Sequence, residues 1–179
     1  MTSFYTEDEL VALGLKSYGT NVLISRKCSI YGAQNIEIGD NVRIDDFCIL
    51  SGKIKLGSHI HISAYVALYG AMGITFEDYT GISPRATIYS AMDDFSGDYL
   101  IGPVHPDELT NVTGASVTVH RFAHIGANAV VYPGIDIPEG TVLGAISLAN
   151  RPLLPWTIYA GIPAKVIKNR SHKVSENLL

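Results

Sequence analysis

Histidine is the residue type in this sequence best suited to moving protons near neutral pH, because its unperturbed pKa is about 6.5. Six histidines are present. His61 and His124 occupy the same kind of position, since each comes directly before an isoleucine, in the segments IHI and AHI. If these isoleucines point into a core, the histidine side chains alternate to the outer surface. Both are therefore candidates for a general base that takes a proton from a bound nucleophile.

A second set of candidate residues lies between residues 91 and 114, a stretch rich in acids, glycine and proline. Carboxylates accept hydrogen bonds from hydroxyl groups, and aromatic rings can pack on the apolar face of a sugar ring. The stretch supplies both types, in Asp93, Asp94, Phe95, Asp98 and Tyr99. It also contains His105. A solvated acidic loop without a ligand is the alternative interpretation of the same residues.

These candidates are set within a repeat of six residues. From Ile38 the chain reads IGDNVR, IDDFCI, LSGKIK, LGSHIH, ISAYVA and LYGAMG, and every block opens with an aliphatic residue. The period returns after residue 114 in VTVHRFAH, IGANAV, VYPGID, IPEGTV and LGAISL. Neither a strand, with a period of about two, nor a helix, with a period of about 3.6, explains an aliphatic residue at every sixth position. A short strand followed by a corner explains it.

The hexads predict an all-β solenoid. Three such strands close a triangular coil of about eighteen residues, and successive coils stack about 4.8 Å apart so that their backbone groups pair. The repeated aliphatic residues then form an inner column, made of Ile38, Ile44, Leu56, Ile62, Ile82, Ile125, Ile137 and Leu143.

The sequence resembles the hexapeptide-repeat acyltransferases over about residues 20–168. Besides the hexads, the segments IGANAVVYPG (125–134) and YAGIPAK (159–165) carry this resemblance. It implies a left-handed parallel β-helix, an acetyl group transferred from acetyl-CoA, a homotrimer, and an extruded loop that reaches a neighbouring subunit's active site. The left-handed turn comes from the resemblance alone, because β-crossovers are otherwise right-handed.

The resemblance makes His61 the predicted general base. Its segment SHIHISAY (58–65) is similar to segments that carry the base on a coil wall in sugar acyltransferases of this fold. Asp45 and Asp46 lie at a corner one coil below, and one of them is expected to orient either this base or the sugar. The alternative role for His61 is that of an interface histidine whose ring binds a neighbouring carbonyl.

His105 is the alternative catalytic residue. Galactoside-type members of the family carry a catalytic histidine on or just before the extruded loop, shortly after a repeat that ends like ATIYS (86–90). Met92 and Asp93 occupy that place here, so we expect His105 to matter less than His61. The predicted substrate-binding residues are Asp45, Tyr65, Asp93 and Asp94.

The predicted acetyl-CoA site lies in the last coils and the tail. Small residues allow the pantetheine arm to run close to the backbone, and basic residues pair with phosphates. From Arg151 onward, five lysines or arginines stand with a single acid, on a chain of net charge −4. The predicted cofactor-binding residues are Gly126, Ala127, Ala145, Arg151, Ile162, Pro163, Lys165 and Lys168. Corner geometry and a solvated basic tail are the alternative explanations of these residues.

Length and composition set the remaining bounds. A chain of 179 residues with 47% hydrophobic and 17% charged residues predicts one folded domain. Its expected parts are an N-terminal cap at about 1–20, coils at about 21–90 and 115–150, an extruded loop at about 91–114, and a tail at 151–179. A capping box, Thr6 with Glu9, predicts a short helix inside the cap.

Charge and hydropathy exclude several classes of protein. The net charge of −4 argues against a general nucleic-acid-binding protein. No apolar run reaches the roughly 18 residues of a membrane span, and the acidic N-terminus lacks the basic start of a signal peptide. We therefore expect a cytoplasmic protein, in which Cys28 and Cys48 stay reduced.

These features together predict an acetyl-CoA-dependent O-acetyltransferase that acts on a sugar in surface polysaccharide or lipopolysaccharide biosynthesis, without a metal. A nucleotide-sugar N-acetyltransferase is the first alternative. Two alternatives come from other classes: a metal protein similar to the γ-class carbonic anhydrases, with His61, His120 and His124 as ligands, and a structural β-helix without catalysis.

Overall fold

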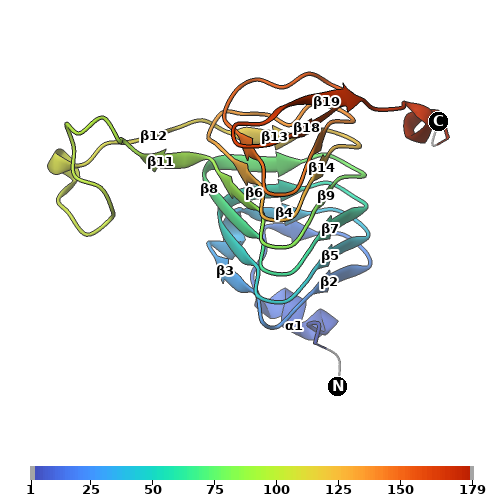
Figure 1. The fold of residues 1–179 in the computed structure, drawn as a ribbon. Helices are drawn as coiled ribbons and strands as arrows, with labels where there is room; N and C mark the ends of the chain where they lie inside the picture. Colours follow the sequence, from blue (N-terminus) through green and yellow to red (C-terminus); the bar gives the residue numbers. More distant parts are fainter. Residues whose placement is uncertain (1–2, 178–179) are drawn as a thin grey trace.

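Stacked triangular coils make up most of the molecule (Figure 1). The computed structural model describes residues 3–177. Strands of successive coils pair in parallel and in register, so each coil provides hydrogen-bond partners for the backbone of the coils above and below it. The predicted left-handed parallel β-helix is confirmed, and so are its short N-terminal helix and its extruded loop.

Three flat walls enclose the core. The first wall contains β3 (Ser29–Tyr31), the beginnings of β6 (Ile49–Leu56) and β8 (Ala67–Phe76), β10 (Thr87–Tyr89), β15 (Val130–Val131) and β17 (Leu148–Ala149). The second wall contains β1 (Ser17–Tyr18), β4 (Ile36–Ile38), the ends of β6 and β8, and β13 (Val117–Val119). The third wall contains β2 (Val22–Ile24), β5 (Val42–Ile44), β7 (Ile60–Ile62), β9 (Gly81–Ile82), β14 (His124–Ile125), β16 (Val142–Leu143) and β18 (Thr157–Ala160). Because β6 and β8 turn a corner, the first and second walls form one continuous sheet.

The inner column is the core of the solenoid. All eight of its predicted aliphatic residues are buried, with exposed fractions between 0 and 4%. Burying one such side chain stabilises a fold by roughly 1.5–3 kcal/mol, so a column repeated on every coil supplies most of the driving force for stacking. Residues directly before and after each aliphatic residue point outward, and this alternation places candidate functional side chains on the walls and corners.

The corner between the second and third walls carries a ladder of aromatic rings. Apart from Gly140, the positive-φ residues of this corner are not glycines, and that conformation costs roughly 1–2 kcal/mol each. Stacking offsets part of this cost: the ring centroids of His59 and Tyr79 are 4.7 Å apart, those of Tyr79 and Phe122 are 5.8 Å apart, and Trp156 follows Phe122 at 6.1 Å. His59 is exposed on this corner.

Both ends of the solenoid are covered. Helix α1 (Glu7–Ala12) begins at the predicted capping box of Thr6 and Glu9, and it buries Leu10 against the first coil. At the other end, prolines interrupt the hexads after Leu148, yet β18 still continues the third wall. Strand β19 (Lys165–Asn169) then folds back antiparallel on β18, and the short helix α2 (Lys173–Glu176) follows. Among the described helices, none has the length and apolar character to cross a membrane.

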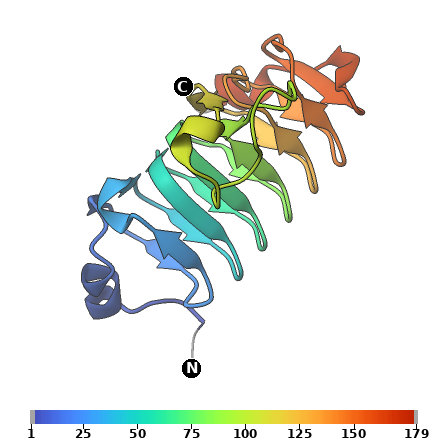
Figure 2. The same ribbon diagram turned by 90° about the vertical axis from the view of Figure 1, so that its left-hand side faces the viewer.

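The extruded loop leaves the coil at the end of the first wall. Strands β11 (Ala91–Asp93) and β12 (Val112–Gly114) form an antiparallel stem, and a 3-10 turn, η2 (Asp107–Leu109), lies in the tip. The stem points away from the coils in Figure 1, and the tip lies in front of them in Figure 2. Asp94 stabilises the loop itself, because its carboxylate accepts hydrogen bonds from the Ser96 backbone N–H at 2.7 Å and from the Asn111 side chain at 2.8 Å.

Candidate active site

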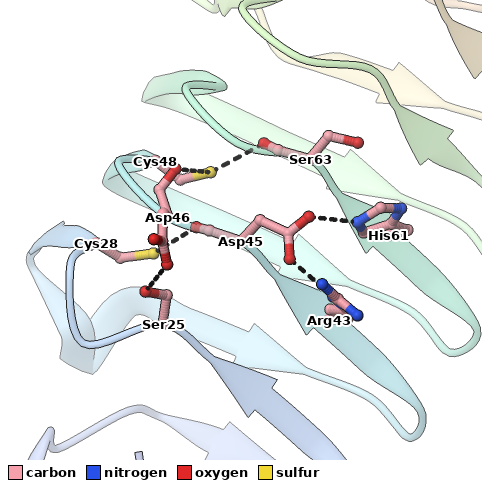
Figure 3. A network of polar contacts seen from close by, with 8 residues as sticks. All are labelled: Ser25, Cys28, Arg43, Asp45, Asp46, Cys48, His61 and Ser63. Carbon is pink, nitrogen blue, oxygen red and sulfur yellow. Dashed lines mark hydrogen bonds and ion pairs between the residues drawn. The ribbon is translucent and has the colours of Figure 1, made fainter. Parts of the chain in front are cut away.

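The third wall presents His61 to the outside, with its neighbours Ile60 and Ile62 in the core. Its Nε2 atom lies 2.7 Å from Oδ2 of Asp45 on the coil below. The other carboxylate oxygen of Asp45 accepts a hydrogen bond from Nε of Arg43, also at 2.7 Å. Figure 3 shows the Asp45 carboxylate between these two side chains. The sequence placed Asp45 and Asp46 one coil below His61. The structure brings Asp45 into contact with the ring, whereas Asp46 accepts hydrogen bonds from Ser25 and Lys27.

The charge of Asp45 is held in place by these contacts. Partial burial favours the neutral acid, but hydrogen bonds from His61 and Arg43 outweigh it and lower the pKa of Asp45 below its usual range. Asp45 is therefore an anion at neutral pH, and it fixes the orientation of the imidazole. This arrangement leaves the His61 ring exposed on one side, as a general base that meets a substrate requires.

Two thiols lie behind this cluster. The Cys28 thiol donates to the backbone carbonyl of Asp45 at 3.0 Å, and the buried Cys48 thiol donates to the carbonyl of Ser63 at 3.1 Å (Figure 3). Both cysteines are free thiols. Their contacts tie the corner that carries Asp45 to the coils on either side.

His124 repeats the same geometry two coils further along. It pairs with Gly81 of β9, and its Nε2 atom lies 2.9 Å from Oγ of Ser83, the corner residue that follows β9. His61 likewise pairs with Arg43 and contacts the corner residue two positions later. Each imidazole therefore reaches down one coil to the residue that follows an inner isoleucine.

The environment of His124 favours the neutral imidazole. Part of its side chain is exposed, but its ring packs closely on the coil below, and this loss of water lowers the pKa of His124. The positive charges of Arg170 and His61 act in the same direction. A neutral imidazole beside a hydroxyl group can hold that hydroxyl in one orientation or accept its proton.

A large groove lies where the extruded loop leaves the first wall. Its volume is about 990 Å³. Tyr69 and Tyr89 stack at 5.3 Å on its floor, Tyr132 continues this row, and Asp93 and His105 line the side formed by the loop. The combination of aromatic faces, phenol groups and a carboxylate suits a polar ligand with flat or ring-shaped parts.

The predicted substrate-binding residues do not meet within one chain. Asp93 and His105 line the groove on the first wall, whereas Asp45 and His61 lie on the third wall. Tyr65 stands at the corner between these walls and stacks on Phe47 at 4.9 Å. Asp94 is engaged inside the loop. The loop extends away from the third wall, so in a single chain it does not approach His61 (Figure 1).

The predicted cofactor residues divide into two groups. Gly126 is needed for stacking, because a Cβ atom there would lie 2.5 Å from the backbone N of Ala145, and Ala127 accepts a backbone hydrogen bond from the corner that follows Ala145. Arg151 and Lys165 line a groove of about 370 Å³ between the last coil and the tail.

The remaining cofactor candidates of the tail do not line this groove. Ile162 is 70% exposed, Pro163 follows it through a cis peptide bond, and Lys168 is exposed on β19.

The three histidines weighed as metal ligands have different partners. His120 lies 3.2 Å from Glu77, while His61 and His124 contact Asp45 and Ser83. Within residues 3–177, no group of three or more His, Cys, Asp or Glu side chains is arranged to hold a metal ion.

Ser83 is the candidate residue that the sequence analysis missed. A signal for it exists, because Ser83 follows the inner residue Ile82 just as Asp45 follows Ile44. This signal is weak, since Ser25 and Ser63 follow inner isoleucines too. The pairing with His124 distinguishes Ser83, and it crosses 41 residues of chain that include the extruded loop.

The chain is similar to known sugar acyltransferases. No family model matches the chain. The dTDP-4-amino-4,6-dideoxy-D-glucose acyltransferase of Escherichia coli is 41% identical over 177 residues, which cover 97% of this chain and 92% of the relative. The galactoside O-acetyltransferase of Escherichia coli K12 is 24% identical over 135 residues, covering 73% of this chain and 62% of that protein.

A solved structure agrees over nearly the whole chain. It is a variant of AntD, an N-acyltransferase from Bacillus cereus, in complex with dTDP-4-amino-4,6-dideoxyglucose and coenzyme A. It is 47% identical, covers 99% of this chain and 96% of its own, and superposes with a TM-score of 0.97. Another AntD structure contains dTDP and 3-hydroxybutyryl-CoA, with the same identity and TM-score.

Proposed function

This chain belongs to the hexapeptide-repeat acyltransferase family, and we propose that it transfers an acyl group from acyl-CoA to the amine of a nucleotide-activated amino sugar. The observation that carries this proposal is full-length similarity to two proteins: an acyltransferase named for such a sugar, at 41% identity, and an N-acyltransferase solved in complex with one, at 47% identity. The O-acetyltransferase expected from the sequence has weaker support, because the galactoside enzyme is 24% identical. N-acyl transfer, the first alternative, is thus favoured.

The AntD structures also indicate which residues to test. They include variants of one serine and of one aspartate ten positions later. In this chain Ser83 and Asp93 are the single serine–aspartate pair with that spacing. Ser83 contacts His124 on the third wall, and Asp93 lines the large groove on the first wall whose floor carries Tyr69 and Tyr89. We assign the acceptor to this groove, where the Asp93 carboxylate can bind the sugar's ammonium group.

A second copy of the chain would complete the site. Ser83 precedes the first-wall strand β10 and Asp93 lies in the stem that follows it, so the two stand at opposite ends of this wall. A substrate that touches both residues therefore bridges two copies, with the third wall of one facing the groove of another. This supports the homotrimer expected from the family, because closed rings are the common solution for a chain with two different contact faces.

The reaction needs a proton acceptor and a stabilised oxyanion. The acceptor's ammonium group loses one proton to the base, and its nitrogen attacks the thioester carbonyl. The nitrogen of the tetrahedral intermediate loses a second proton as the C–S bond breaks, which gives the amide, and the released CoA thiolate takes up a proton. We retain His61, held by Asp45, as the proposed base. The Ser83 hydroxyl, held by His124, is the proposed donor to the oxyanion. Arg151 and Lys165 are the proposed partners of the CoA phosphates.

A product analysis tests the proposed function. The purified chain is incubated with acetyl-CoA or 3-hydroxybutyryl-CoA and dTDP-4-amino-4,6-dideoxyglucose, and free thiol release is followed together with the mass of the sugar product. The product should resist hydroxylamine, which cleaves O-esters and leaves amides intact. A matched arm uses dTDP-glucose, which offers hydroxyl groups alone. Turnover of dTDP-glucose to a hydroxylamine-sensitive product, without turnover of the amino sugar, would contradict this proposal and support O-acetyl transfer instead.

A further inference from the structure

Gly81 occupies an unusual place in the third wall. The outward positions of this wall form a column in which each residue pairs with the next: Leu23, Arg43, His61, Gly81, His124 and Val142. A glycine in a strand has no side chain to pack and frequently marks a close approach of another group. Gly81 is buried all the same, so another group covers it.

The covering group is the imidazole of His124. A Cβ atom at position 81 would lie 3.1 Å from Nδ1 and 3.3 Å from Cε1 of this ring. Both distances are shorter than ordinary van der Waals contacts, so a methyl group would push the ring outward. The φ angle of Gly81 lies outside the left-handed region, and alanine would be free to adopt its backbone conformation. Space for the ring is therefore what position 81 provides.

The next atom of the same ring, Nε2, which is bonded to Cε1, makes the contact with Ser83. Nε2 lies 2.9 Å from the serine Oγ. A comparison of the Asp45–His61 and Ser83–His124 pairs explains why the His124 ring must lie so close to the wall. Asp45 reaches His61 with an oxygen two bonds beyond its Cβ, whereas the Ser83 oxygen is one bond beyond its Cβ. A histidine that binds the shorter side chain has to approach the wall more closely, and a side chain at position 81 would block it.

We propose that Gly81 is a positioning residue for acyl transfer: it lets the His124 imidazole lie against the wall and thereby holds the Ser83 hydroxyl in its reactive orientation. This inference rests on the proposed function for its catalytic consequence. Its structural part, the dependence of the His124–Ser83 contact on an empty position 81, stands independently of any substrate.

Kinetics of Gly81→Ala test the catalytic part. We expect kcat to fall about tenfold, as for a misplaced positioning contact, with both KM values within about twofold of the unchanged protein. In a Ser83→Ala background the same substitution should change kcat by less than about twofold, because residues that act through one contact are not additive. Val142→Thr, which alters the other strand neighbour of His124 at nearly constant volume, is the matched control and should keep normal kcat. An unchanged kcat in Gly81→Ala, or additive losses with Ser83→Ala, would overturn the proposal.

Two measurements without substrate test the structural part. In NMR titrations the His124 ring signal should titrate at a higher pH in Gly81→Ala, because the displaced ring regains water. The thermal midpoint should fall in Gly81→Ala but stay unchanged when the substitution is made in a His124→Ala background, where no ring is present to collide. An unshifted His124 titration, or an equal loss of stability in both backgrounds, contradicts the inference even if the chain proves inactive on amino sugars. Inactivity combined with the expected NMR and thermal results would instead refute the proposed function alone.

Discussion

Ser83 and His124 lie 2.9 Å apart on neighbouring coils of the third wall, although the extruded loop separates them in the sequence. His61 and Asp45 form the same contact two coils below, at 2.7 Å. The two pairs differ in charge: a carboxylate faces His61 and a hydroxyl group faces His124. One repeated backbone geometry thus provides a site for a base that is paired with an anion, and a site for a neutral histidine that holds an alcohol.

The first prediction concerns pH. Burial, with the charges of Arg170 and His61, lowers the pKa of folded His124, so between its folded and unfolded pKa values the unfolded chain binds more protons. The contribution of His124 to the free energy of unfolding is therefore complete above about pH 6.5, and it decreases as the pH drops below that value. We expect denaturant titrations to show that the free energy of unfolding decreases less between pH 7.5 and pH 5.5 in His124→Gln than in the unchanged chain. Equal losses in both proteins would contradict the lowered pKa.

The second prediction assigns the base. His61→Gln should lower kcat by about two to four orders of magnitude with little change in either KM, which is the signature of lost proton abstraction. Asp45→Asn should lower kcat less and shift the acidic limb of the pH–rate profile, because Asp45 acts through His61.

His105→Gln is the comparison for this assignment. His105 lines the groove, and its loss should cost less than about tenfold, as for a residue that positions the acceptor. If His105→Gln is nearly inactive and His61→Gln is active, the loop histidine carries the proton and the assignment to His61 is wrong.

The hexads determine which parts of this site could be predicted from the sequence. A repeated aliphatic residue specifies the inner column and therefore the direction of every neighbouring side chain, so the outward positions of His61 and Asp45 could be read from the sequence. The contact between Ser83 and His124 could not, because it depends on the empty position at Gly81 and on a coil closed across the long loop. The end of the solenoid was hidden for a related reason: prolines mask the hexad of β18, whose pairing with β16 is a long-range contact.

The third prediction locates acyl-CoA. Lys165 and Arg151 line the groove at the end of the solenoid, so Lys165→Glu should raise the KM for acyl-CoA several-fold through repulsion of its phosphates, while the KM for the amino sugar stays nearly constant. Lys53→Glu is a matched control, because it makes the same charge change at a different groove, bordered by the second wall. Equal KM values in the two variants would contradict the assignment.

The fourth prediction is that the acceptor site uses residues from two subunits. Light scattering at micromolar concentration should give the mass of a trimer. Ser83→Ala and Asp93→Asn should each be nearly inactive as pure proteins. When the two variants are co-expressed with different tags and mixed trimers are purified, some sites pair an intact Ser83 from one subunit with an intact Asp93 from its neighbour. Every such mixed trimer contains one intact site among its three, so about one third of the normal activity should return. If both residues instead act within one chain, every site carries one of the two substitutions and no activity returns, whatever the composition of the trimer. The matched control mixes the unchanged chain with the double variant in equal amounts and allows random assembly. A site shared between two subunits should then give about one quarter of full activity. A site within one chain should give about one half.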